Sequence, residues 1–395
     1  MESFKRFLLA GVAAITVLAS ASPSQAACEL KLGVVGGLSG ATAQWGNAIK
    51  AAVEFVAKKA NDAGGLQVGS ERCQVTTTVI DTKATAEGAA AAANQLVSQG
   101  IKFVLGPVVS PEATGIKPIA TRNNMLVFLN SYAKNAIGPQ WPLVFHEGPG
   151  PSVWADQIVK VAKEKFNIKS VVVVAPNDQG GTDIASVDVD VYRKNGIEAT
   201  EEYYQRGTAN FAAIVTRILS KNPDAVDTAS SAPSDAGIIV KQLRQAGFKG
   251  PVGRLGGAAT DEIVRIVGSV EAVGDSYWYE NVAVSDPNVQ AIYSDYKQVM
   301  GTEAPENTTM ILWSAASQAL LDGISKAGTI SDTQKVAEAL RTLPLNDKYL
   351  GKGFWTGKKF FGIKQELAFP FGIGMIVDGK KLPVQRVQPV DRDNE

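Results

Sequence analysis

The hydrophobic pattern of the chain alternates short β-branched runs with stretches of helical periodicity from Leu30 onward. Apolar residues recur at helical spacing between positions 49 and 60, and Gly64-Gly65 ends that stretch. Strands are predicted at 74–81, 103–106 and 126–129, with helices at 85–98 and 111–123 between them. Strands and helices that alternate in this way predict βαβ units and therefore a parallel sheet.

A stretch rich in proline and glycine, Gly148-Pro149-Gly150-Pro151, interrupts this rhythm. Because these residues disfavour regular structure, we expect the chain to pass there from one lobe to another. The alternation restarts with a helix from Ser152 and a fully apolar strand, Val171–Val174. Further strands are predicted at 197–204, 225–229 and 252–255. The second lobe should therefore share the architecture of the first.

The rhythm changes again near Gly274, where the strand-like run Tyr277-Trp278-Tyr279 precedes long helices. These helices are predicted at 288–300, 309–327 and 331–342 and are assigned to the first lobe. A glycine-rich tail with strand-like runs begins near Lys348 and is expected to cross back. Lobe 1 is thus predicted to comprise residues 27–147 plus 276–347, and lobe 2 residues 148–275 plus 348–395.

The predicted fold class is α/β, with two Rossmann-like lobes whose parallel-sheet cores are joined by a three-segment hinge. A few residues at such crossings can absorb a rigid-body closure of one lobe onto the other. The length agrees, because about 370 residues beyond the N-terminal segment exceed what one hydrophobic core usually supports.

The first residues have the pattern of a secretory signal peptide over 1–26. Lys5 and Arg6 precede a mostly apolar run, and small residues at Ser24 and Ala26 fit a cleavage site. An uncleaved anchor is the alternative, but it needs about twenty apolar residues. No later segment reaches the length of a spanning helix. We therefore expect a protein exported to the periplasm.

Charge and cysteine content narrow the partners. The chain has 39 basic and 39 acidic residues without a block of like charges, so we expect no nucleic-acid partner. Its two cysteines, Cys28 and Cys73, each precede a predicted strand, and an exported chain meets an oxidising compartment. A disulfide between them is the preferred interpretation. The alternative is a lipidated Cys28, although Gln25 stands where a lipoprotein signal usually has Leu.

Motifs for catalysis, metals and nucleotides are missing from the sequence. The glycine-rich turn at 36–40 lacks the spacing of dinucleotide sites and the lysine of a P-loop. Ser39 is not in a nucleophile elbow, and no paired C-x-x-C or H-E-x-x-H occurs. We expect neither an enzyme nor a cofactor or metal. The single histidine, His146, is either a ligand contact at the lobe crossing or a satisfied histidine at a strand end.

Several short motifs together resemble the leucine/isoleucine/valine-binding protein family, type I periplasmic binding proteins of ABC importers. They are Gly37-Leu38-Ser39-Gly40 with Gln44-Trp45-Gly46, Ala63-Gly64-Gly65, and the run from Gly100 to Gly106. The similarity extends over essentially the whole chain after the signal peptide. It implies a ligand cleft between the lobes and a partnership with membrane permease subunits.

The resemblance also implies which first-lobe residues bind the ligand. Ser110 matches the hydroxyl that contacts the ligand carboxylate, at a helix start where an anion is favoured. Ser131, Tyr132 and Ala133 match a loop of further donors, with Ala133 in place of the family's threonine. Trp45 matches an aromatic wall of the cleft; the alternative is a buried hydrophobe.

Second-lobe positions depart from the family. Amino-acid-binding members hold the ammonium with an acidic residue and tyrosines, but this chain has Gly180-Gly181, Ser230-Ser231 and Gly256-Gly257 there. A buried ammonium without a counter-charge is costly, so Gly180, Ser231 and Gly257 disfavour an α-amino acid. The hypothesis is a carboxylate without an amine, and more sharply an aromatic acid. One alternative is a ligand amine held by Asp178, Asp183 or Glu280. Arg254, at the end of a predicted second-lobe strand, is a candidate for a second anion contact. The alternative function is a free-standing sensor of amides or urea.

Overall fold

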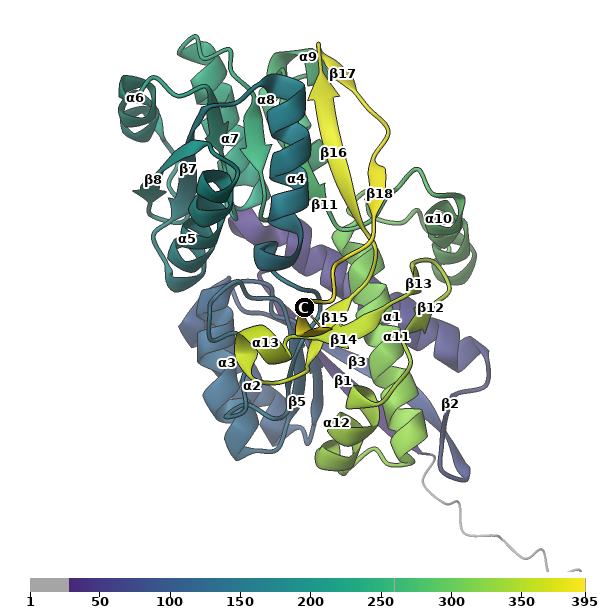
Figure 1. The fold of residues 1–395 in the computed structure, drawn as a ribbon. Coiled ribbons are helices and arrows are strands. Elements are labelled where there is room, and N and C mark those ends of the chain that lie inside the picture. The colour runs from purple at the N-terminus through teal and green to yellow at the C-terminus, as the bar shows by residue number, and fades with distance from the viewer. Residues whose placement is uncertain (1–27, 259, 395) are drawn as a thin grey trace, which may run out of the picture.

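The computed structural model describes residues 28–258 and 260–394, which form two α/β lobes, one above the other in Figure 1. The predicted signal peptide, 1–26, lies outside the described residues. The first sheet has the order β14-β15-β6-β5-β4-β1-β3-β2, with parallel pairing from β3 through β15. Its strands are β1 (Glu29–Gly36), β2 (Leu66–Val68), β3 (Glu71–Asp81), β4 (Phe103–Leu105), β5 (Leu126–Leu129), β6 (Val144–His146), β14 (Phe354–Thr356) and β15 (Glu366–Ala368).

The second sheet has the order β17-β16-β11-β10-β9-β7-β8 and is parallel from β8 to β11. Its strands are β7 (Ser170–Pro176), β8 (Glu198–Tyr204), β9 (Ala225–Asp227), β10 (Val252–Arg254), β11 (Ser276–Glu280), β16 (Phe371–Val377) and β17 (Lys380–Lys381), with β18 (Gln385–Val387) beside β16. A small separate hairpin pairs β12 (Asn346–Asp347) with β13 (Gly351–Lys352).

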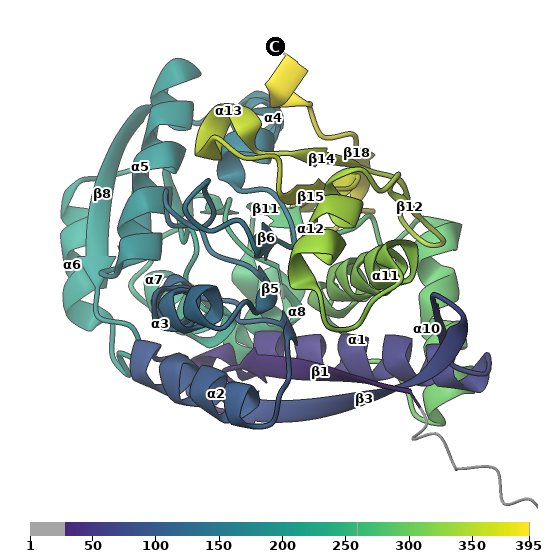
Figure 2. The ribbon, with the colours of Figure 1, turned by 90° about the horizontal axis from the view of Figure 1, so that it is seen from below.

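Helices cover both faces of each sheet, as Figures 1 and 2 show. With the first sheet lie α1 (Ala43–Asp62), α2 (Ala86–Ser98), α3 (Ser110–Arg122), α10 (Pro287–Met300), α11 (Thr309–Ala327), α12 (Thr333–Arg341), α13 (Lys358–Phe361) and the 3-10 turns η1 (Gly40–Thr42) and η2 (Arg392–Asn394). With the second lie α4 (Pro151–Phe166), α5 (Gln179–Lys194), α6 (Ala212–Ser220), α7 (Pro233–Gln245), α8 (Thr260–Val267) and α9 (Val270–Val273).

The position of β7 inside the second sheet explains why its sequence is continuously apolar. Val171 and Val173 pack into the core formed with α4 and α5, whereas Val172 and Val174 pack into the core formed with α6 and α7. Successive side chains of a strand point to opposite faces, and both faces of this sheet are covered. The strand therefore needs no polar side.

The structure corrects the predicted assignment of two segments. Residues 276–280 were assigned to lobe 1, but β11 pairs with β10 and β16 in the second sheet, and the return follows Glu280. The tail from 348 was assigned to lobe 2, but β14 and β15 join the first sheet before β16 enters the second. Strand pairing over long sequence distances decides these positions, and local patterning does not encode it.

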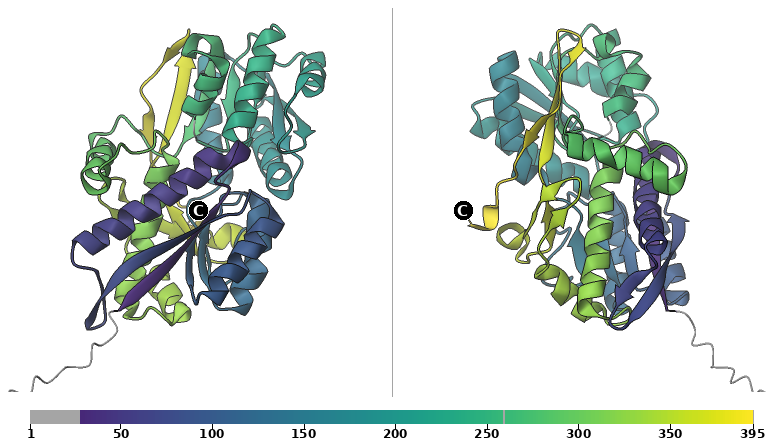
Figure 3. Two further views of the ribbon diagram at one scale, coloured as in Figure 1. Left: turned by 180° about the vertical axis from the view of Figure 1, so that it is seen from behind. Right: turned by 90° about the vertical axis from the view of Figure 1, so that its right-hand side faces the viewer.

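Three segments consequently connect the sheets: the one between β6 and α4, the one after β11, and the one between β15 and β16. After β18 the chain approaches lobe 1 again, where the Asp393 carboxylate accepts from the backbone N–H groups of Lys358 and Lys359. In the right-hand view of Figure 3 the C-terminus lies at one side of the molecule, at the level where the two lobes meet.

The predicted disulfide is confirmed, with a Cα–Cα distance of 4.3 Å between Cys28 and Cys73. It ties the start of β1 to β3, its neighbour in the sheet. Within the described part of the chain, no helix is both long enough and apolar enough to cross a membrane.

Candidate functional site

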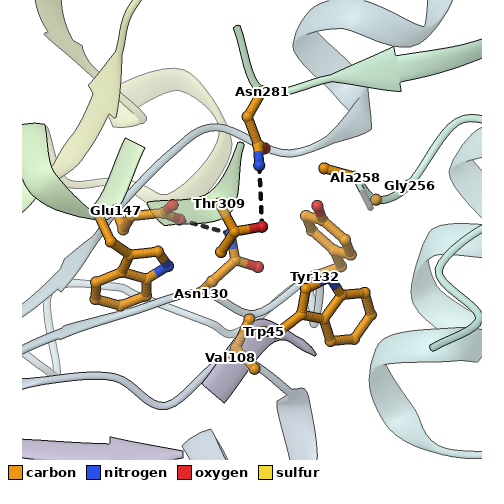
Figure 4. A pocket seen from close by; sticks show the side chains of 11 residues that line it. Trp45, Val108, Asn130, Tyr132, Glu147, Gly256, Ala258, Asn281 and Thr309 are labelled. Carbon is orange, nitrogen blue, oxygen red and sulfur yellow. Dashed lines mark hydrogen bonds between the residues drawn. The ribbon is translucent and has the colours of Figure 1, made fainter. Parts of the chain in front are cut away.

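Two adjoining spaces lie between the lobes, and Trp45, Val108 and Tyr132 line both of them. The outer space is bordered by Ser110, Gly180, Arg206 and Ser230. The inner space, drawn in Figure 4, is bordered by Asn130, Glu147, Gly256, Gly257, Ala258, Asn281, Thr309 and Trp313. Because they share three lining residues, the two spaces form one narrow cleft between the lobes.

Ser110 lies at the first residue of α3, so the helix N-terminus faces the outer space. The chain reaches this point through Gly106, whose φ is +93°. A Cβ there would lie 1.8 Å from the Val35 carbonyl oxygen, so only glycine permits this turn. Ser110 Oγ accepts a hydrogen bond of 2.8 Å from Ser131 Oγ. A hydroxyl at a helix N-terminus suits an anion.

The two lobes touch beside Ser110. Gly180 stands in the first turn of α5, and a Cβ at this position would lie 2.1 Å from Ser110 Oγ. Nearby, the Lys134 backbone N–H donates to Asp183 Oδ2 over 2.7 Å, and Gln179 Nε2 donates to Asn135 Oδ1 over 3.1 Å. The structure is therefore a closed arrangement, and the glycine permits the close approach.

Arg206, which follows β8, brings a cation to the outer space. Its Nε donates to Asp178 Oδ2 at 2.7 Å, and Asp178 Oδ1 accepts from the Gly181 N–H at the start of α5. Nη1 of Arg206 is buried and has no hydrogen-bond partner within residues 28–258 and 260–394. Ser230 Oγ, which lines the same space, likewise lacks a partner in that part of the chain. Both groups can serve a ligand.

Arg254 is a second buried cation, but it lies behind the loop at 256–258. Its guanidinium donates to the carbonyl oxygens of Gly257, Ser231 and Ala258 at 2.9–3.0 Å. Burial lowers its pKa to about 10, which leaves it charged at neutral pH. Arg254 therefore shapes the cleft wall, since its hydrogen bonds fix the loop that carries Gly257.

The inner space contains a buried carboxylic acid. Glu147 is 2% exposed, and its Oε2 accepts a 2.7 Å hydrogen bond from Asn130 Nδ2. Burial raises the pKa of Glu147 to about 7. Trp313 of α11 is fully buried, and its indole Nε1 has no hydrogen-bond partner in the described chain. Figure 4 shows the rings of Trp45 and Tyr132 across from Glu147.

The residues of the predicted loop 131–133 border two different spaces. Tyr132 lines both parts of the cleft, but Ser131, Ala133 and His146 border a separate space on the α13 side of the loop. His146 Nε2 accepts from the Ser131 backbone N–H, and Nδ1 lies 2.9 Å from Glu366 Oε1. With both ring nitrogens engaged, His146 positions the loop that carries Tyr132.

Of the predicted second-lobe positions, Gly180 and Gly257 reach the cleft, but Ser231 does not. Ser231 is fully buried, and its Oγ donates to the Val174 carbonyl, whereas its neighbour Ser230 lines the cleft. Four residues that line the cleft were not predicted from the sequence: Arg206, Ser230, Glu147 and Trp313. The available signal for Glu147 was its position next to His146, directly after a strand.

Comparison with known proteins places this architecture in a family. A family model described as periplasmic binding protein matches residues 29–368. The chain belongs to the periplasmic binding protein family. This periplasmic binding protein is 26% identical over 335 residues to the leucine-, isoleucine-, valine-, threonine-, and alanine-binding protein of Pseudomonas aeruginosa, covering 83% of this chain and 86% of that one.

Solved structures agree with the fold. The leucine binding protein LivK of Thermotoga maritima has a TM-score of 0.75 at 21% identity, covering 93% of this chain and 100% of that one. A solute binding protein of an ABC transporter from R. palustris, solved with benzoate, has a TM-score of 0.71 at 16% identity, covering 92% and 98%. The predicted resemblance and fold class are therefore confirmed. The family's members bind solutes and are not enzymes, as predicted.

Proposed function

We propose that this periplasmic binding protein is the solute-binding component of an ABC importer and closes over a small carboxylic acid that has no amine. The observation that carries the proposal is that Ser110 and Arg206, from different lobes, line the same outer space. One lobe supplies a hydroxyl at a helix N-terminus, and the other supplies a guanidinium whose Nη1 has no partner among the described residues. A carboxylate held between them would favour the closed state through contacts with both lobes.

The acids that could hold an ammonium are already engaged. Asp178 pairs with Arg206, and Asp183 accepts from the Lys134 backbone N–H. Glu280 accepts hydrogen bonds from Thr308, Trp278 and the Asn281 backbone. Glu147 lines the inner space, whereas Ser110 lines the outer one. Because an α-amino acid carries both groups on one carbon, a carboxylate at Ser110 leaves its ammonium without a counter-charge nearby.

Aromatic walls support an aromatic acid as the sharper choice. Trp45 and Tyr132 border the whole cleft, and Gly257 leaves room beside Trp45, since a Cβ there would lie 3.5 Å from the indole. Flat apolar ligands gain from stacking and area burial between such rings. The benzoate-bound relative indicates that the fold accommodates an acid of this kind.

Delivery to membrane permease subunits and a periplasmic location belong to the same proposal. Family membership, the N-terminal pattern of residues 1–26 and the Cys28–Cys73 disulfide support export to an oxidising compartment.

Native mass spectrometry of the purified protein, followed by extraction of any bound molecule, tests the proposal. We expect the mass of a carboxylic acid without a basic nitrogen. Calorimetry with Arg206→Gln should then show a loss of affinity for that acid of at least about tenfold, since a charged hydrogen bond contributes about 1.5–3 kcal/mol. An exposed cation, Lys335→Gln, is the control. A bound amino acid, or an unchanged affinity in Arg206→Gln, would contradict the proposal.

A branched-chain amino acid is the second candidate, because the P. aeruginosa relative is named for such ligands. It requires Glu147 or another acid to reach the ammonium in a different ligand orientation. Tight binding of leucine with no binding of simple acids would favour this candidate.

A further inference from the structure

The inner space is lined by a fully buried hydrogen-bond donor. Trp313 Nε1 has no partner among the described residues, although Trp313 lines the space and is 0% exposed. Buried N–H groups in native proteins nearly always have an acceptor. An acceptor atom of a ligand in this space would satisfy it.

The same space has a buried acceptor. Glu147 is 2% exposed and receives one hydrogen bond, from Asn130, but no ion pair within the part of the chain that the structure describes. A carboxyl group has more acceptor capacity than one hydrogen bond fills. A donor on the ligand would use that capacity.

Resting on the proposed function, we infer that the ligand is a hydroxy acid whose hydroxyl, at the end opposite its carboxylate, binds between Trp313 and Glu147. The hydroxyl oxygen accepts from Trp313 Nε1–H, and the hydroxyl proton is donated to Glu147.

Other terminal groups form a hydrogen bond with at most one of the two residues, Trp313 and Glu147. A methyl group offers neither a donor nor an acceptor, and an ammonium has no lone pair to accept from Trp313. A second carboxylate would accept from Trp313 but has no proton to donate to Glu147. A hydroxyl is a donor and an acceptor at once. Because Trp45 and Tyr132 line both spaces, their rings would contact a ligand that reaches from Ser110 to this end, which favours a phenol.

Calorimetry with three phenylacetates tests the inference on the purified protein. The probes are phenylacetate and its 4-hydroxy and 4-methyl derivatives. We expect the 4-hydroxy acid to bind at least about tenfold more tightly than phenylacetate and the 4-methyl acid. Trp313→Phe should remove most of that advantage, so that the 4-hydroxy and 4-methyl acids bind the variant with similar affinity.

Trp141→Phe is the matched control, because Trp141 Nε1 is also unpaired in the described chain but does not line the cleft. If Trp313→Phe fails to fold, Glu147→Gln with the same probes gives the second measurement, in which the advantage of the 4-hydroxy acid over the 4-methyl acid should fall. Equal binding of phenylacetate, 4-methyl and 4-hydroxy acids would overturn the inference alone. Absence of binding for every acid would overturn the proposed function as well.

Discussion

Buried polar groups without a partner among the described residues lie at both ends of the cleft. Arg206 Nη1 and Ser230 Oγ lie at the outer end, and Trp313 Nε1 lies at the inner end. Burying such groups without partners costs stability, so a ligand that pairs with them would gain affinity. Ser110 and Arg206, from different lobes, line the outer end, which suits a carboxylate.

Replacing Ser110 with alanine removes the proposed hydroxyl donor without adding bulk beside Gly180. We expect the affinity for a carboxylate ligand to fall more than about tenfold, because the lost hydrogen bond is to a charged group. Thr121→Ala, at the exposed end of the same helix, should bind as the unmodified protein does. Titration calorimetry measures both; an unchanged affinity in Ser110→Ala would remove Ser110 from the site.

Glu147 makes the stability of the free protein depend on pH. Its pKa rises from 4.5 to about 7 on folding because of burial, so the folded protein keeps a proton that the unfolded chain releases above pH 4.5. The free energy of unfolding therefore falls as pH rises from about 4.5 to about 7, by at most about 1.4 kcal/mol per unit.

Glu147→Gln should reduce that fall without abolishing it, because burial also raises the pKa of Glu112 to about 7. Denaturant unfolding at several pH values measures the effect, with the exposed Glu87→Gln as control. A variant with the same pH slope as the unmodified protein would show that Glu147 is ionised in the folded state.

Sequence reasoning anticipated part of the candidate site. Five of the predicted residues line the cleft: Trp45, Ser110, Tyr132, Gly180 and Gly257. The first three match family motifs in the local sequence, and the two glycines stand at family positions where other residues are usual. Arg206 and Trp313 were not predicted. Arg206 lies in the loop after the edge strand β8, and Trp313 lies in the apolar helix α11. Tertiary packing brings both residues to the cleft.

At the scale of elements, the N-terminal turns of α3 and α5 meet face to face across the cleft. Gly180 makes this possible, since any side chain there would collide with Ser110 Oγ. Gly180→Ala should weaken ligand binding at least about tenfold by preventing full closure, yet leave the unfolding temperature unchanged or slightly raised, because alanine favours a helix. Ser186→Ala, further along α5, is the control. Unimpaired binding in Gly180→Ala would mean that the bound state is more open than this structure.

The Cys28–Cys73 bond closes a loop with a sequence separation of 45 and holds β1 against β3. Replacing both cysteines with alanine should lower the free energy of unfolding by about 2–4 kcal/mol. Denaturant unfolding checks this, and reductant should destabilise the unmodified protein to a similar extent but leave the variant unaffected. Equal stability with and without the bond would contradict a structural role.

Most predicted elements occur within a few residues of their expected bounds, because buried parallel strands and amphipathic helices have strong local periodicity. The exceptions concern which sheet a strand joins. Residues 276–280 and 354–368 have ordinary strand patterns, and only their long-range partners assign them to a lobe.

At the scale of the whole molecule, three segments join the lobes, and ligand contacts from both lobes would stabilise closure. The cleft residues lie at the carboxyl ends of the strands in each sheet, where open parallel sheets commonly bind ligands. The central claim is that this closed cleft selects a carboxylate without an amine.

Calorimetry of the purified protein with acids and their α-amino counterparts tests this claim most directly. Phenylacetate with phenylglycine, and 4-methylpentanoate with leucine, are pairs that differ only by the α-ammonium. The amine-free member of each pair should bind at least about a hundredfold more tightly, because burying an ammonium without a counter-charge costs several kcal/mol. Tighter binding of phenylglycine or leucine than of its amine-free partner would contradict the account.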